Sequence, residues 1–171
     1  LIGPNGAGKS TLFNLVDGQL APDQWRVLFN GDSLTAWTTA ERTRHGIGRT
    51  FQVAQTFATL TVLQNVQLAL VAAAGGALGI TRMLWDLRVE AANALLKQVG
   101  LQHLAADAAA SLAYGDSKRL ELALALAAKP RLLLMDEPTA GMAAAERFAL
   151  MQTIVALAEA MPGDPRFELV V

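Results

Sequence analysis

Near its beginning the chain reads Gly3-Pro4-Asn5-Gly6-Ala7-Gly8-Lys9-Ser10, which fits the pattern G-x-x-x-x-G-K-[ST]. Glycines let the backbone of such a loop curl so that successive N–H groups point inward at phosphate oxygens. A helix predicted over residues 10–16 directs its positive end at the same place. In this phosphate loop, Lys9 is expected to reach the β- and γ-phosphates and Ser10 to bind Mg²⁺. The expected nucleotide-binding residues are Asn5, Gly6, Ala7, Gly8, Lys9, Ser10 and Thr11.

Two acidic residues follow an apolar run late in the chain. Residues 131–135 read RLLLM, the pattern of a buried strand, and Asp136 and Glu137 come directly after it. Open α/β sheets bind ligands at the carboxyl ends of their strands. We therefore expect Asp136 to hold Mg²⁺ through water and Glu137 to polarise an attacking water. Solvated loop residues are the alternative, and the phosphate loop favours the functional interpretation.

Helical and extended patterns alternate along the chain. They predict helices over residues 10–16, 61–71, 85–99, 117–129 and 144–160, and a polar segment over 35–44 that starts helical. They predict a loop over 111–116 and strands over 1–2, 26–30, 46–52, 131–135 and 167–171. Such alternation is typical of an α/β domain with a largely parallel sheet. No repeat or linker divides the sequence, so one domain is expected.

The composition argues against several classes of protein. The 171 residues include 14 Lys and Arg against 15 Asp and Glu, a net charge of −1, so we expect no nucleic-acid partner. The chain has no cysteine, which excludes disulfides and thiolate metal sites. The longest uncharged apolar run, residues 68–80, is shorter than the roughly 18 residues of a membrane-spanning helix. No signal-peptide pattern opens the chain.

A third motif lies between the phosphate loop and the acidic pair. Residues 112–121 read LAYGDSKRLE, and Gln52 ends the stretch RTFQ, residues 49–52. Together and in this order, the four features resemble the nucleotide-binding domain of an ABC transporter over essentially the whole chain. Three segments are similar to the ATPases of branched-chain amino acid importers: residues 46–52, GIGRTFQ, residues 60–66, LTVLQNV, and Tyr114-Gly115-Asp116 with Leu120-Glu121. Urea and short-amide importers are close relatives of that subfamily.

The resemblance implies a P-loop NTPase of ABC type, with a mostly parallel sheet, flanking helices and an inserted helical subdomain at about residues 53–125. It implies a subunit that binds and hydrolyses ATP with Mg²⁺ to power import of branched-chain or other amino acids. Two such subunits pack head to tail around two ATP molecules. They sit peripherally on the cytoplasmic face of a membrane, against transmembrane permease subunits that receive substrate from a binding protein.

Roles for individual residues follow from the same resemblance. Catalytic roles fall to Glu137, Gln52 and Lys9. Magnesium binding falls to Ser10, Gln52 and Asp136, the last through water. The nucleotide of the partner subunit is contacted in trans by Ala113, Tyr114, Gly115 and Asp116. The segment after Gln52 and the apolar run 68–80 are candidate permease contacts, with a glycine-broken core helix as the alternative for the run.

The sequence departs from the family pattern at several places. Ala113 stands where a serine is usual, Trp25 stands where a glycine is common, and residues 139–142, TAGM, lack the usual aspartate. No aromatic residue precedes the phosphate loop, and no histidine follows the final strand. We therefore expect a domain, residues 1–171, that is truncated at both ends. We expect the isolated chain to hydrolyse ATP feebly or not at all.

Other interpretations stay open beside the transport ATPase. A non-transport ABC ATPase of DNA repair or chromosome organisation usually carries long coiled-coil insertions, and the chain has no sustained heptads. A nucleotide-binding fragment without turnover is the third possibility. We expect Trp25, Trp37 and Trp85 to be packing residues. His45 and His103 have no paired ligands in the sequence.

Overall fold

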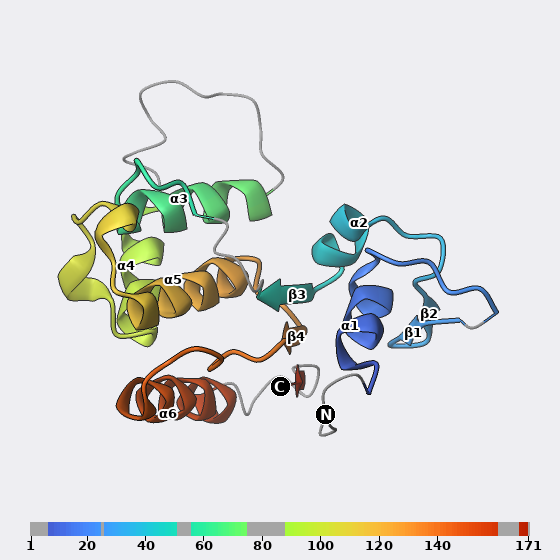
Figure 1. Cartoon of the computed structure of the whole chain (residues 1–171). Helices are drawn as coiled ribbons and strands as arrows, with labels where there is room; N and C mark the ends of the chain where they lie inside the picture. The colour runs from blue at the N-terminus through green and yellow to red at the C-terminus, as the bar shows by residue number, and fades with distance from the viewer. Residues whose placement is uncertain (1–6, 25, 51–55, 75–87, 161–167, 171) are drawn as a thin grey trace.

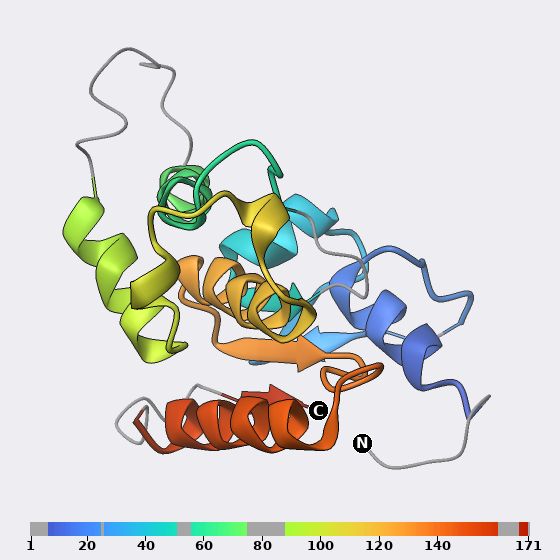
Figure 2. The same ribbon diagram turned by 60° about the vertical axis from the view of Figure 1, so that its left-hand side comes forward.

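A computed structural model gives the fold and describes residues 7–24, 26–50, 56–74, 88–160 and 168–170. Its main sheet has three parallel strands in the order β3-β4-β5. Strand β3 is Ile47–Thr50, β4 is Leu132–Met135 and β5 is Glu168–Val170. Figure 2 shows the arrows of β4 and β5 running in the same direction. The parallel sheet predicted from the sequence is confirmed for these strands.

Six α-helices lie in the described residues (Figure 1). They are α1 (Lys9–Asp17), α2 (Thr39–Arg44), α3 (Val62–Ala73), α4 (Val89–Gln98), α5 (Tyr114–Ala127) and α6 (Ala144–Ala160). Two short 3-10 turns, Gln102–Leu104 and Ala109–Ser111, join α4 to α5. Of these described helices, none is long and apolar enough to span a membrane.

The strand predicted over residues 26–30 is shorter than expected and stands apart from the main sheet. Strand β1 (Leu28–Phe29) pairs antiparallel with β2 (Asp32–Ser33). Between them, Asn30 has φ 53° and Gly31 has φ 91°. Two successive left-handed residues form the turn that closes a two-residue hairpin. The chain therefore reverses here before the strand can extend.

Capping boxes set the start of α2 and α3. The Thr38 hydroxyl accepts from the backbone N–H of Glu41, whose carboxylate accepts from the Thr38 N–H at 2.7 Å. Thr61 and Gln64 make the same reciprocal pair at α3. Each pair satisfies two N–H groups that the first helical turn leaves open. Helix α2 therefore begins at residue 39, although the sequence predicted a helical start near 35.

The prediction of a loop over residues 111–116 is wrong for residues 114–116, which belong to helix α5. Ala113 is extended, with ψ 157°, and its carbonyl oxygen accepts from the Ser117 N–H at 2.9 Å. This bond closes the first turn of α5, which begins at Tyr114. Ala113 offers no side-chain oxygen to cap the helix, so the sequence carries no capping signal for this start.

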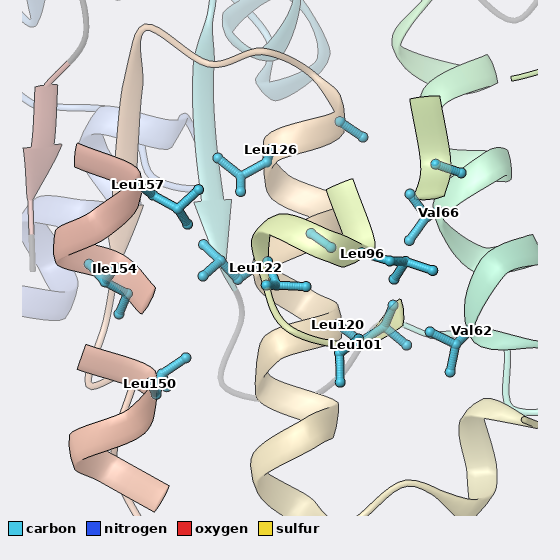
Figure 3. Close-up of a cluster of buried hydrophobic side chains, with 14 of the residues drawn as sticks. Val62, Val66, Leu96, Leu101, Leu120, Leu122, Leu126, Leu150, Ile154 and Leu157 are labelled. Carbon is cyan, nitrogen blue, oxygen red and sulfur yellow. The ribbon is translucent and has the colours of Figure 1, made fainter. Parts of the chain in front are cut away.

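The hydrophobic core lies on both faces of β4. On one face Leu133 and Met135 join the large cluster formed by helices α3 to α6. Figure 3 shows Leu150, Ile154 and Leu157 of α6 directed toward Leu122 and Leu126 of α5, which separates α6 from Val62 and Val66 of α3. On the other face the smaller cluster contains Phe13, Leu34, Ile47, Leu132 and Leu134. The residues of β4 are therefore packed on both faces of the sheet.

Candidate nucleotide-binding site

The described part of the phosphate loop, residues 7–11, forms the start of α1. Gly8 caps the helix with φ 80°, which glycine adopts without steric cost. Its carbonyl oxygen accepts the first helical bond from Leu12 at 2.9 Å. The N–H groups of residues 9–11 therefore have no acceptor within the helix. The first turn contains no acidic residue, so this end of α1 favours an anion. Asn5, Gly6 and Gln52 lie outside the described residues.

The two acids that follow β4 have unlike surroundings. Leu134 packs with Phe13 of α1, whereas Met135 packs in the large cluster on the other face. Because side chains alternate along a strand, Asp136 continues the α1 face, and it is buried. Glu137 follows with φ 48°, a conformation uncommon outside glycine, and it is exposed. One carboxylate is thus enclosed beside α1, and its neighbour is open to solvent.

Sequence reasoning missed Arg49 of β3, which lies between α1 and the end of β4. Its Nη1 donates to Oδ1 of Asn14 at 2.6 Å and to Oδ2 of Asp17 at 2.8 Å. Its Nη2 lies 3.8 Å from Oδ2 of Asp136. One guanidinium therefore faces two buried carboxylates. The sequence did carry a signal for this role, because Arg49 is a charged residue inside a short strand pattern. A charged side chain is rarely buried without a charged partner, so the position predicts nearby carboxylates.

The third motif lies against the loop that follows β4. The Tyr114 hydroxyl donates to the carbonyl oxygen of Ala140 at 3.0 Å. Gly115 is buried, and a Cβ at this position would lie 3.3 Å from the terminal carbon of Met142. Ala113 and Tyr114 remain exposed. The motif thus presents an open surface while its glycine allows close packing behind it. Oδ1 of Asp116, in the same turn, lies 3.7 Å from Nη1 of Arg119.

A cavity of about 270 Å³ joins the third motif to the acidic pair. Its polar lining residues are Thr50, Tyr114, Lys118, Glu121, Asp136 and Glu137. None of the described phosphate-loop residues, 7–11, lines this cavity. Within the part of the chain that the structure describes, the third motif therefore borders the cavity of the acidic pair, and the phosphate loop does not.

Glu121, which the sequence analysis quoted as part of the third motif without giving it a role, is a buried carboxyl on α5. Burial raises the pKa of Glu121, and two hydrogen bonds from Lys118 Nζ, both 3.1 Å long, partly oppose that rise. The pair lies at the cavity of the acidic residues. Its signal in the sequence was a lone acid inside the apolar helical pattern LELALAL, residues 120–126.

A second, more apolar cavity of about 330 Å³ lies between α3 and α5, beside β3. Its apolar lining includes Leu68, Ala69 and Ala72 of α3 and Leu124, Ala125 and Ala128 at α5. The part of the apolar run 68–80 that the structure describes thus lies on helix α3, with one face on this cavity. Residues 75–80 lie outside the described residues.

Trp37 packs against the smaller core cluster, and its ring lies 4.0 Å from that of His45 between centroids. The prediction that Trp37 is a packing residue is confirmed. Trp25 and Trp85 lie outside the described residues.

The family model for ABC transporters matches residues 1–140. One relative, a probable branched-chain amino acid transport ATP-binding protein LivG of Methanocaldococcus jannaschii, is 37% identical over 148 residues, covering 84% of this chain and 58% of the relative. The lipopolysaccharide export system ATP-binding protein LptB of Haemophilus influenzae is 34% identical over 145 residues, covering 82% and 56%. The chain belongs to the ABC transporter family.

The fold is that of the same family. The dimeric structure of an ATP-binding cassette in a post-hydrolysis state, bound to ADP and Pi, matches with a TM-score of 0.76 at 28% identity. The match covers 99% of this chain and 71% of that one. The predicted α/β fold of ABC type is thus confirmed. The chain spans little more than half the length of the two curated relatives named above.

Proposed function

We propose that this chain is the ATP-binding and ATP-hydrolysing part of an ABC transporter. The observation that carries the proposal is the burial of Asp136 on the α1 side of the sheet, because α1 begins with Lys9 and Ser10. Residues 5–11 bind the phosphates of ATP, and Lys9 neutralises the β- and γ-phosphates. Glu137, assisted by Gln52, orients the water that attacks the γ-phosphate.

The residues fit a magnesium ion. Mg²⁺ prefers hard oxygen ligands and keeps several of its waters. Ser10 is exposed at the start of α1, and the Asp136 carboxylate meets Arg49 only at ion-pair distance, 3.8 Å. We therefore assign Mg²⁺ to Ser10, Gln52 and Asp136, the last through water. The ion supplies charge neutralisation of the phosphates when it is bound.

A second ATP-binding subunit completes the site in this proposal. Ala113, Tyr114, Gly115 and Asp116 contact the nucleotide held by that partner. Exposure of Ala113 and Tyr114 at the start of α5 supports the assignment, since a helix N-terminus favours an anion. The similar cassette whose structure is described as dimeric with ADP and Pi supports it further.

The proposed membrane contact is the apolar cavity between α3 and α5. Its lining is rich in Leu and Ala and reaches Thr50, two residues before Gln52. A permease segment seated there touches the same strand end as the nucleotide site. The chain then sits peripherally on the cytoplasmic face. Helices α3 and α4 with most of α5, within about residues 53–125, form the helical subdomain of one nucleotide-binding domain, of which residues 1–171 are a part.

Branched-chain or other amino acids are the proposed substrates, and similarity to LivG supports them. Similarity to LptB makes lipopolysaccharide export the second candidate, and a urea or short-amide importer the third. Proteoliposomes that contain the full-length protein and its permease separate these. Stimulation of ATP turnover by a leucine-loaded binding protein is expected. Stimulation by urea or lipopolysaccharide alone would overturn the amino-acid assignment.

Exchange of Glu137 for Gln tests the hydrolytic role. In the full-length protein, Glu137→Gln is expected to lower turnover by about 10²- to 10⁴-fold and to leave an ATP-bound dimer that light scattering detects. Glu90→Gln, an exposed acid of α4, is the matched control. A Glu137→Gln protein that stays monomeric with ATP, or keeps its turnover, would contradict the proposal.

A further inference from the structure

Asp17, at the last turn of α1, holds the guanidinium of Arg49. Its Oδ2 accepts from Arg49 Nη1 at 2.8 Å, and its side chain is 4% exposed. Gln19 fixes the carboxylate through a backbone bond of 2.9 Å and a side-chain bond of 3.1 Å. Asn14, one turn earlier, accepts from the same Nη1. Arg49 is thus anchored to α1 by two neighbouring acceptors.

The other amino group of Arg49 stops short of Asp136. Nη2 lies 3.8 Å from the Asp136 carboxylate, beyond hydrogen-bond length, whereas Asp17 is at 2.8 Å. Both carboxylates are buried, so each attracts the guanidinium strongly, and the charge of Asp17 draws it toward α1 and away from Asp136. Arg42, the second arginine near Asp17, is not free to move toward Asp136. Its guanidinium is fixed by the carbonyl oxygens of Leu15, Val16 and Leu34.

We propose that Asp17 is a positioning residue that keeps Arg49 from forming a direct hydrogen bond with Asp136. Its effect is to leave the Asp136 carboxylate available to the water shell of Mg²⁺. The inference rests on the magnesium role proposed for Asp136. Ser10 and Asp17 lie at opposite ends of α1, so a single helix carries one proposed magnesium ligand and the residue that positions Arg49 beside another, Asp136.

Loss of the Asp17 charge therefore has a predictable effect. Without it, Arg49 is expected to move onto Asp136 and to compete with the cation. If the N–O separation falls from 3.8 Å to the 2.8 Å seen at Asp17, Coulomb's law with an effective dielectric constant of about 20 gives about a tenfold change in cation affinity.

The test measures the affinity of the full-length protein for a fluorescent ATP analogue, mant-ATP, over a series of Mg²⁺ concentrations. Asp17→Asn is expected to raise the half-saturating Mg²⁺ concentration about tenfold, with affinity for Mg²⁺-free mant-ATP unchanged. Adding Arg49→Gln to Asp17→Asn removes the competing charge and is expected to restore the original Mg²⁺ dependence. Glu90→Gln, at an exposed position of α4, removes one negative charge far from Asp17 in the sequence and is the control.

The other possible results distinguish a failure of the role proposed for Asp17 from a failure of the proposed magnesium site. If Asp17→Asn leaves the Mg²⁺ dependence unchanged while Asp136→Asn raises the half-saturating concentration, the role of Asp17 is wrong. If the double variant remains as impaired as Asp17→Asn, Asp17 acts through structure and the inference fails. If Asp136→Asn itself changes nothing, the proposed magnesium site fails. Should Asp17→Asn not fold, Asn14→Ala must shift the Mg²⁺ dependence in the same direction by a smaller factor.

Discussion

Exchange of Lys118 for Met isolates the buried carboxyl of Glu121. Both oxygens of Glu121 accept from Lys118 Nζ at 3.1 Å, and the two side chains are 6% and 10% exposed. Methionine keeps most of the length and apolar volume of lysine. The variant Lys118→Met therefore removes the charge partner while leaving the packing of α5 nearly intact.

The size of the effect depends on pH, because the variant can protonate Glu121 instead of burying an unpaired charge. Burial already raises the pKa of Glu121 above its ordinary value of 4.5, and loss of Lys118 raises that pKa further. A carboxyl with a raised pKa in the folded state binds protons more readily there than in the unfolded chain. Its contribution to stability is therefore greatest below pH 4.5 and declines as pH rises toward the folded pKa.

The largest possible loss of unfolding free energy in Lys118→Met equals the free energy needed to protonate an ordinary carboxyl at the pH of the experiment. With an unfolded value of 4.5, this amounts to about 3 kcal/mol at pH 7 and less than about 1 kcal/mol at pH 5. We expect the stability difference between Lys118→Met and the original protein to grow by up to about 1.4 kcal/mol per pH unit between these limits.

Urea denaturation of the full-length protein, followed by circular dichroism at pH 5, 6 and 7, measures this difference. Lys97→Met, which removes an exposed lysine of α4, is the matched control and is expected to be neutral at every pH. Adding Glu121→Gln to Lys118→Met is expected to abolish the pH dependence. A loss of stability that is the same at pH 5 and pH 7 would refute the reasoning.

Two further changes test the packing and the helix caps. Leu122→Ala in the core of α5, where Leu122 is 1% exposed, is expected to lower the free energy of unfolding by about 2–5 kcal/mol. The exposed Leu28→Ala serves as its control in the same urea titration, and equal losses would contradict the assigned core. Thr61→Ala removes the capping box of α3 and is expected to cost about 1 kcal/mol, whereas Thr61→Ser retains the hydroxyl. A serine variant as unstable as the alanine variant would show that the cap is not the cause.

Local signals in the sequence accounted for most of the framework. The apolar run before Asp136 predicted β4, and the glycine-rich loop before Lys9 predicted the start of α1. Thr38 and Glu41 have the spacing of a capping box, so the true start of α2 was present in the sequence although the helix was expected to begin earlier. The start of α5 had no such signal, because Ala113 cannot cap a helix with its side chain.

The sequence by itself determined which chemistry the chain carries. Two local patterns carry it: a lysine and a serine at the end of a glycine-rich loop, and two acids after an apolar strand. The position of each of these residues depends on its neighbours in the chain and on the local backbone conformation. The charges that surround these residues were decided only by tertiary structure. Arg49 meets Asn14 and Asp17 across more than thirty residues, and it meets Asp136 across a strand pair. The periodicity of the sequence does not predict such contacts, because they form only when the chain folds and brings β3 next to both α1 and β4.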